Sequence, residues 1–163
     1  MKIKLYGTGG AVADADSPSF LIDEMILVDA PENIAKKLLR NGYFPKVVCI
    51  THFHADHDFG VVMLICQKNW RKKDNFTLIA PKGAGERYRN LLAMTNYGAQ
   101  SEILPNIIEI DGKIQKEGIG LFGYNIKPQK MDYGSTAKPI DVFGYIITKD
   151  SKSAAFSGDA ILD

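Results

Sequence analysis

A chain of 163 residues, of which 45% are hydrophobic and 24% charged, has the size and composition of a globular domain, so we expect a single domain over residues 1–163. The formal net charge of +1 gives no overall field that would attract nucleic acid or an anionic membrane surface. No stretch approaches ~18 consecutive apolar residues, and the first residues lack the apolar segment of a signal peptide, so we expect a cytoplasmic protein that does not enter a membrane.

The first part of the chain combines short apolar strands with amphipathic helices. Alternating or continuous runs of branched apolar residues predict strands, and apolar residues spaced three to four apart before a Gly predict helices. The expected strands are residues 2–6, 19–22, 25–28, 46–50 and 76–80. The expected helices run from Pro31 to Gly42, from 60 to 67 and from 86 to 97. Helices that each pack on a sheet in this order predict the first half of an αββα sandwich.

After residue 105 the pattern is that of strands. Ile107–Ile110 and Lys113–Gln115 flank Asp111-Gly112, which predicts a β-hairpin. The remaining expected strands are residues 118–127, 143–148 and 153–156. No repeat, low-complexity segment or linker interrupts this part of the sequence.

The two cysteines lie in apolar contexts on either side of a histidine-rich segment. We expect Cys49 and Cys66 to be buried thiols rather than a disulfide, which fits a reducing cytoplasm. Cys49 lies inside an expected strand and Cys66 lies well along an expected helix. Neither is therefore expected to bind a metal.

All three histidines of the chain lie within one short segment, at positions 52, 54 and 57, with Asp56 between the last two. Imidazole nitrogens and carboxylate oxygens are ligands that Zn²⁺ accepts. His52 and His54 are two residues apart and can face one ion, while Asp56 and His57 can face a second ion a few Å away. Two ions roughly 3.5–4 Å apart are a recurring hydrolytic arrangement. The segment follows the expected strand 46–50, which places a metal site beyond the carboxyl end of that strand.

These residues resemble a known family. Thr-His-x-His-x-Asp-His followed by Gly, as it stands over residues 51–60, is similar to the hallmark of the metallo-β-lactamase-fold hydrolases. Residues 5–11 resemble the opening of the ribonuclease-Z-like branch, and residues 26–30 resemble the strand whose Asp precedes the first helix. Residues 157–159 resemble the late strand whose Asp bridges two metals. The resemblance covers residues 2–159.

The resemblance implies an α+β fold, the metallo-β-lactamase-like αββα sandwich. It implies a set of metal ligands: His52, His54, Asp56, His57 and Asp159. It also implies that Asp56 orients the nucleophilic water and that Asp29 supports the ligands from behind, with a helix cap as the alternative role of Asp29. The implied cofactor is one or two Zn²⁺ ions, with Mn²⁺ or Fe as alternatives.

Two histidines that the family normally supplies have no counterpart in this sequence. Alignment from the strand that ends at Met131 puts Tyr133 at the first position, and alignment back from Phe143 puts Lys138 there. We take Tyr133 as the candidate substitute ligand, with ordinary packing as the alternative. The second missing histidine and the family's last helix and strands would follow Asp159. The chain is therefore expected to be a C-terminally truncated sandwich, as a fragment or as a naturally shortened member.

The sequence leaves two functions open. The first is metal-dependent hydrolysis of a phosphodiester or related ester, with a small molecule or a phosphodiester as substrate. The second is a non-catalytic binding or assembly domain, which the missing ligands favour. The basic residues between Lys68 and Lys73 around Trp70 are the feature that supports a nucleic-acid partner, although such clusters usually form the solvated end of a helix. Sheet edges left uncovered by truncation predict a homo-oligomer.

Overall fold

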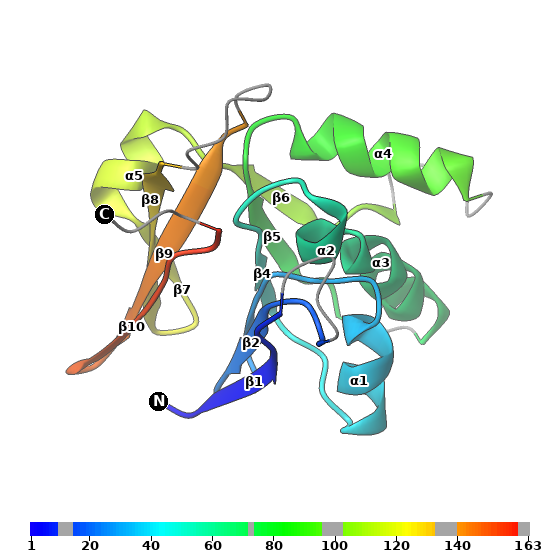
Figure 1. Cartoon of the computed structure of the whole chain (residues 1–163), viewed down its shortest axis with the longest axis horizontal. Helices are drawn as coiled ribbons and strands as arrows, with labels where there is room; N and C mark the ends of the chain where they lie inside the picture. The colour runs from blue at the N-terminus through cyan, green and yellow to red at the C-terminus, as the bar shows by residue number, and fades with distance from the viewer. Residues whose placement is uncertain (10–14, 72–73, 96–102, 133–139, 160–163) are drawn as a thin grey trace.

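The computed structural model describes residues 1–9, 15–71, 74–95, 103–132 and 140–159. Two β-sheets stack face to face, and helices lie on the outer sides of the pair (Figure 1). This arrangement is the αββα sandwich of the metallo-β-lactamase fold, as the sequence predicts. None of the helices in the described ranges has the length and apolar character that a membrane span requires.

The larger sheet has six strands in the order β1-β2-β3-β4-β5-β6. Their bounds are β1 (Ile3–Gly7), β2 (Ser19–Ile22), β3 (Ile26–Val28), β4 (Val47–Cys49), β5 (Thr77–Ala80) and β6 (Asn106–Glu109). The first three strands pair antiparallel, and β3 to β6 pair parallel. Every residue of β3, β4 and β5 is buried, because both faces of this part of the sheet are covered.

Helices cover the outer face of the six-stranded sheet (Figure 1). They are α1 (Ile34–Arg40), α2 (Ala55–Asp58), α3 (Gly60–Trp70) and α4 (Ala84–Met94). The apolar core on this side joins Leu27 and Val48 of the sheet to Leu38 of α1, Ile65 of α3 and Tyr88 of α4. The sheet and its helices together form the layer that carries the histidine-rich segment.

The smaller sheet has four antiparallel strands in the order β10-β9-β8-β7. Their bounds are β7 (Ile119–Leu121), β8 (Tyr124–Met131), β9 (Val142–Lys149) and β10 (Lys152–Phe156). Helix α5 (Gly112–Glu117) packs beside β8, on the side away from the larger sheet (Figure 1). Apolar residues of both sheets fill the space between the layers, including Val28 and Cys49 from one sheet and Ile126 and Ile147 from the other.

Two contacts between the sheets reach the end of β4. The hydroxyl of Tyr145 donates to the backbone oxygen of Ile50 at 2.7 Å, and the backbone N–H of Phe143 donates to that of Thr51 at 2.9 Å. Tyr145 is fully buried, so its hydroxyl needs this partner. The smaller sheet therefore holds the backbone immediately before His52.

Two predictions for the second half of the chain were wrong. Lys113–Gln115 is part of helix α5 rather than a strand, because the Asp111 side chain caps the helix by accepting the N–H groups of Lys113 at 3.0 Å and Ile114 at 2.9 Å. The expected long strand 118–127 is instead the hairpin of β7 and β8. Phe122 and Gly123 turn it with φ values of 51° and 78°, as a two-residue hairpin turn with both φ angles positive requires.

The first helix also begins later than predicted. Helix α1 starts at Ile34, whose N–H donates to the Pro31 oxygen across a turn, so Pro31 precedes the helix. Cys49 and Cys66 are buried free thiols, as expected. Lys68 and Trp70 lie in the last turn of α3 and Arg71 follows it, whereas Lys72 and Lys73 lie outside the described residues.

Candidate metal centre

The site lies where three strands of the two sheets end. Val28 ends β3 and is followed by Asp29, Cys49 ends β4 two residues before Thr51, and Phe156 ends β10 three residues before Asp159. Parallel pairing of β3 with β4 brings their carboxyl ends together, and β10 reaches the same edge from the other sheet. Residues far apart in the chain therefore meet at one place, which is the usual position of sites in such sheets.

The three histidines and two aspartates of the predicted ligand set converge there. His52 Nε2 lies 3.0 Å from His54 Nδ1 and 3.7 Å from an Asp159 carboxylate oxygen. His57 Nε2 lies 3.2 Å from the other Asp159 oxygen and 3.6 Å from Asp56 Oδ2. Asp56 and His57 lie in the single helical turn of α2. The structure thus brings together all five residues that the sequence singled out as ligands.

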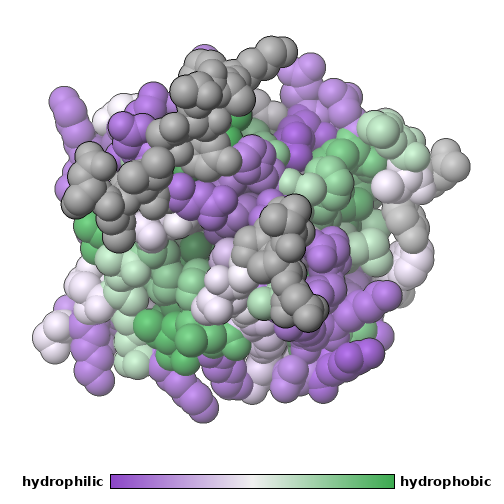
Figure 2. All heavy atoms as spheres, viewed as in Figure 1, coloured by the Kyte–Doolittle hydropathy of each residue, from purple (hydrophilic) through white to green (hydrophobic). Residues whose placement is uncertain are grey.

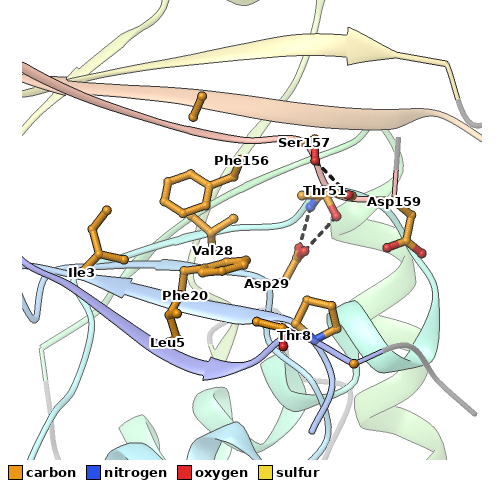
Figure 3. Close-up of a pocket in the computed structure, with 14 residues that line it drawn as sticks. Ile3, Leu5, Thr8, Phe20, Val28, Asp29, Thr51, Phe156, Ser157 and Asp159 are labelled. Carbon is orange, nitrogen blue, oxygen red and sulfur yellow. Dashed lines mark hydrogen bonds between the residues drawn. The ribbon is translucent and has the colours of Figure 1, made fainter. Parts of the chain in front are cut away.

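Buried hydrogen bonds fix how two of the rings point. Asp29 accepts the backbone N–H of Thr51 at 2.8 Å and its hydroxyl at 3.0 Å, and Asp29 Oδ2 lies 2.8 Å from His57 Nδ1 (Figure 3). The Thr51 hydroxyl also lies 2.9 Å from His52 Nδ1. With both Nδ1 atoms occupied, His52 and His57 present Nε2 to the site. Asp29 supports the site in this way and does not cap α1, whose first residue follows Asn33.

Burial and charge act in opposite directions on the two rings. Burial lowers the pKa of His52 to about 3, so this ring is neutral at physiological pH. Burial also lowers the pKa of His57, but the Asp159 carboxylate 3.2 Å from Nε2 and the hydrogen bond with Asp29 outweigh it and raise the pKa to about 10. The close His57 ring in turn lowers the pKa of Asp159. An excess of carboxylate around His57 thus holds a positive charge at this point.

The donor atoms fit a divalent cation. One ligand atom each from His52, His54 and Asp159 lies within 4.8 Å of the others. His57 Nε2 is buried and makes no well-directed hydrogen bond, although Asp159 lies close. A buried polar atom without a partner is costly, and a cation among these nitrogens and carboxylates would satisfy it. Imidazole and carboxylate together are a donor set typical of Zn²⁺ and related transition metals.

A cavity of about 450 Å³ opens beside the site, between β1 and β10. Figure 3 shows Asp29, Thr51 and Asp159 at one end and Ile3, Leu5, Phe20 and Phe156 toward the other. The rings of Phe20 and Phe156 lie 4.9 Å apart. No Lys or Arg lines this cavity among the described residues, so its walls are largely apolar apart from the carboxylate end.

The remaining expectations fall elsewhere. Tyr133, the candidate substitute ligand, lies outside the described residues. Sequence reasoning missed the roles of Thr51, which bonds both Asp29 and His52, and of Asp58, which is fully buried directly after His57. A second acidic residue directly after the Asp56-His57 pair is a sequence signal that could have drawn attention to Asp58.

A comparison with protein families decides where this chain belongs. The profile of the β-lactamase superfamily domain matches residues 25–161, which include every residue of the site. The chain belongs to the β-lactamase superfamily. The matched residues include the strand, the histidine segment, the helix after it and the late Asp159.

Several relatives of this chain carry the name Ribonuclease Z. The chain is 31% identical over 115 residues to Ribonuclease Z of Borreliella afzelii, covering 69% of this chain and 34% of that protein. It is 27% identical over 166 residues to Ribonuclease Z of Pyrococcus horikoshii, covering 96% of this chain and 51% of that protein. The chain thus spans about half the length, or less, of these superfamily relatives.

Solved structures agree on the fold. The short form of human tRNase Z superposes with a TM-score of 0.71 at 16% identity, covering 97% of this chain and 69% of that one. The metallo-β-lactamase fold protein YhfI from Bacillus subtilis gives 0.70 at 17% identity, covering 95% and 61%. A diphosphatase from the PhnP family gives 0.63 at 21% identity, covering 89% and 61%. The superfamily fold is therefore present over nearly all of this chain.

Proposed function

We propose that this chain is a metal-dependent phosphodiesterase. One or two divalent cations would be held by five side chains: His52, His54, Asp56, His57 and Asp159. The observation that carries the proposal is the convergence of these groups at one sheet edge, with the buried Nε2 of His57 directed at Asp159 and lacking a hydrogen bond. Membership of the β-lactamase superfamily and the similarity to proteins named Ribonuclease Z support it.

Each residue of the site has its own role in the proposed hydrolysis. A divalent cation at this site supplies Lewis-acid polarisation of a phosphoryl oxygen and lowers the pKa of water. His52 is neutral when metal-free, so it is ready to donate its Nε2 lone pair. Asp159 lies close to both His52 and His57 and would help to hold the ion or ions beside them. Asp56 lies at the edge of the cluster, where its carboxylate can orient a water and accept its proton.

The substrate class follows from the relatives and the cavity together. Ribonuclease Z is a name for proteins that act on RNA, and RNA supplies phosphodiesters. The cavity beside Asp159 has room for a small-molecule group, since ligand sites of this kind are typically ~300–1,000 Å³. We therefore propose a phosphodiester with a neutral group that occupies the cavity. The donor set favours Zn²⁺, with Mn²⁺ or Fe as alternatives.

Hydrolysis of bis(4-nitrophenyl) phosphate tests the proposal. The chain loaded with Zn²⁺ or Mn²⁺ should release 4-nitrophenol, and EDTA should abolish the release. Asp56→Asn and His57→Ala should each lower kcat/KM by at least 100-fold. The matched control is Asp74→Asn, because Asp74 is exposed, pairs with Lys46 and precedes β5, at the end of that strand opposite to the site. Release from the loaded wild-type chain no faster than from Asp56→Asn would contradict the proposal.

A non-catalytic binding or assembly domain is the second candidate. The observation that favours it is that the sequence contains three histidines, all in one segment, so the site has no histidine from elsewhere in the chain. In that case the chain would bind metal at the same residues and hydrolyse none of the phosphodiesters tested. The same assay, run together with a metal titration, therefore separates the two functions.

We also propose that the protein resides in the cytoplasm. Cys49 and Cys66 are buried free thiols, which suits a reducing compartment. Fractionation of cells that express the native gene, with an antibody to the chain, tests this placement. Recovery in the membrane or secreted fraction would contradict it.

A further inference from the structure

A buried carboxylate lies directly beside the proposed ligands. Asp58 follows His57 in α2, and its side chain is fully buried. Arg87 of α4 pairs with it in the two-pronged geometry that suits a guanidinium and a carboxylate: Nε donates to Oδ2, and Nη2 donates to Oδ1 at 3.0 Å. Tyr88, the next residue of α4, donates its hydroxyl to the same carboxylate at 3.3 Å.

The same guanidinium also holds the other half of the histidine segment. Arg87 Nη2 donates to the backbone oxygen of Phe53 at 3.1 Å, and the guanidinium carbon lies 4.9 Å from the centre of the Phe53 ring. Phe53 lies between His52 and His54. One side chain of α4 therefore contacts the residue between the first two histidines and the residue after the third.

The histidine segment depends on contacts with other elements for its conformation. Helix α2 has four residues, and its N-cap, His54, makes no capping hydrogen bond with its side chain. A single helical turn is not stable by itself, because few hydrogen bonds compensate for the ordering of its backbone. The orientation of Asp56 and His57 therefore depends on contacts from outside α2, which include the hydrogen bond with Asp29 and the Arg87–Asp58 pair.

We propose that Arg87 is a positioning residue for the metal centre. It joins the Phe53 carbonyl to the Asp58 carboxylate and so fixes the spacing between the His52–His54 pair and the Asp56–His57 pair. This inference rests on the proposed metal site. Residues that hydrogen-bond to the metal ligands without touching the ion typically change metal affinity by about 10–100-fold when they are replaced. Arg87 is expected to act on affinity in this range without touching the ion or the substrate.

Metal titration of Arg87 variants tests the proposal. Zn²⁺ affinity is measured by competition with a chromophoric chelator, on the metal-free full chain, for wild type, Arg87→Lys and Arg87→Met. We expect Arg87→Met to lose at least tenfold in affinity. Arg87→Lys should lose less, because an ammonium can contact Asp58 or Phe53 but cannot match the fork of the guanidinium.

Two control variants separate positioning from general stability. Arg89→Met removes the same side chain from an exposed position of the same helix, and Leu92→Ala shortens a buried side chain of α4 that belongs to the apolar core. Both should bind Zn²⁺ within twofold of wild type, although Leu92→Ala lowers Tm. Amide hydrogen exchange of residues 53–59 in the metal-free chain should accelerate in Arg87→Met and not in Leu92→Ala.

The outcomes are distinct. If Arg87→Met folds and binds Zn²⁺ with an affinity within twofold of wild type, the positioning role of Arg87 is wrong and the proposed function stands. Wild type that binds no metal overturns the proposed function and this inference with it. If Arg87→Met does not fold, the double variant Asp58→Leu/Arg87→Met removes the unpaired buried charge and takes its place. Affinity of that double variant within twofold of wild type also overturns the inference.

Discussion

The carboxylate of Asp29 lies 2.8 Å from Nδ1 of His57, and both side chains are buried. An ionised carboxylate can only accept a hydrogen bond, so Nδ1 keeps a proton whether or not Nε2 is also protonated, and Nε2 is the atom that faces Asp56 and Asp159. Asp29 also receives both polar hydrogens of Thr51. A residue at the end of β3 thereby sets the direction of a ring in α2.

Replacing Asp29 by Asn should weaken metal binding. The amide nitrogen can donate to His57 Nδ1, which moves the ring proton to Nε2 and blocks the atom that would bind the ion. We expect a loss of about 10–100-fold in Zn²⁺ affinity in a competition titration, the range typical of residues that orient metal ligands. Asp74→Asn serves as the control with the same chemical change at an exposed position before β5. Affinity of Asp29→Asn equal to that of the control would contradict this role.

Metal affinity should rise with pH because of His57. Its pKa is raised to about 10, so the ring of the metal-free chain is protonated at neutral pH, and an ion must displace one proton from Nε2. Affinity should therefore increase about tenfold per pH unit from pH 6.5 to 8.5, beyond the change in the metal alone. His52 adds no proton in this range, because its pKa is lowered to about 3.

Calorimetry counts that proton directly. Zn²⁺ titrations at pH 7.5 in buffers of different ionisation enthalpy should give a release of about one proton per chain. Removal of the His57 side chain in His57→Ala should reduce the release toward zero. No difference in heat between buffers for the wild-type chain would show that His57 is already neutral or does not take part.

Gly60 should tolerate no side chain. It is the first residue of α3, and a Cβ there would lie 2.1 Å from the Pro31 oxygen and 2.7 Å from the Ala30 oxygen. We expect Gly60→Ala to lower the free energy of unfolding by about 1–3 kcal/mol, the cost typical of overpacking a tight contact. Urea unfolding measures it. Gly112→Ala is the control, since its Cβ would meet no atom within 4 Å, and equal stability of the two variants would refute the packing argument.

The edge strands β1 and β10, with apolar surface between them, predict self-association. Each of these strands pairs with one neighbour among the described strands, and Ile3 and Leu5 of β1 are 43% and 64% exposed. Figure 2 shows an apolar area on this face of the molecule, between the regions that Figure 1 labels β10 and β1. Unpaired edges beside apolar surface favour pairing with another chain. We expect a mass of at least twice 18.0 kDa in sizing chromatography with light scattering.

A charge in the cavity should reverse that association. Leu5→Glu should shift the chain toward the monomer, whereas Met94→Glu, at an exposed position of α4, should not. A wild-type chain that elutes strictly as a monomer would contradict the expectation of a homo-oligomer.

Local sequence signals predicted most of the sandwich and less of its second half. The strands around β3, β4 and β5 were predictable because continuous runs of branched residues mark strands buried on both faces. The Asp111-Gly112 pair was misread as a hairpin, since an Asp can either turn a hairpin or cap a helix and only the fold shows which. The turn at Phe122 carries a bulky residue at positive φ, which propensity argues against.

The histidine segment was predictable because its residues adjoin in sequence, and the resemblance to the metallo-β-lactamase-fold hydrolases added Asp29 and Asp159 from other elements. The contacts that hold these side chains in place were not predictable. The spacing of His52, His54 and His57 indicates a metal site from the sequence alone. The pair between Asp58 and Arg87 joins residues 29 positions apart, so no local pattern reveals it. The two bonds of Thr51 to Asp29 and His52 depend on the parallel pairing of β3 with β4, which is a property of the folded sheet.

Metal content per chain tests the central claim most directly. Elemental mass spectrometry is run on protein purified without chelator or a metal-binding tag, after incubation with Zn²⁺ or Mn²⁺ and removal of unbound ions. The account predicts between one and two transition-metal equivalents per chain, reduced by at least half in His52→Ala. A content near zero for the wild-type chain after both incubations would contradict the metal centre and the hydrolytic function built on it.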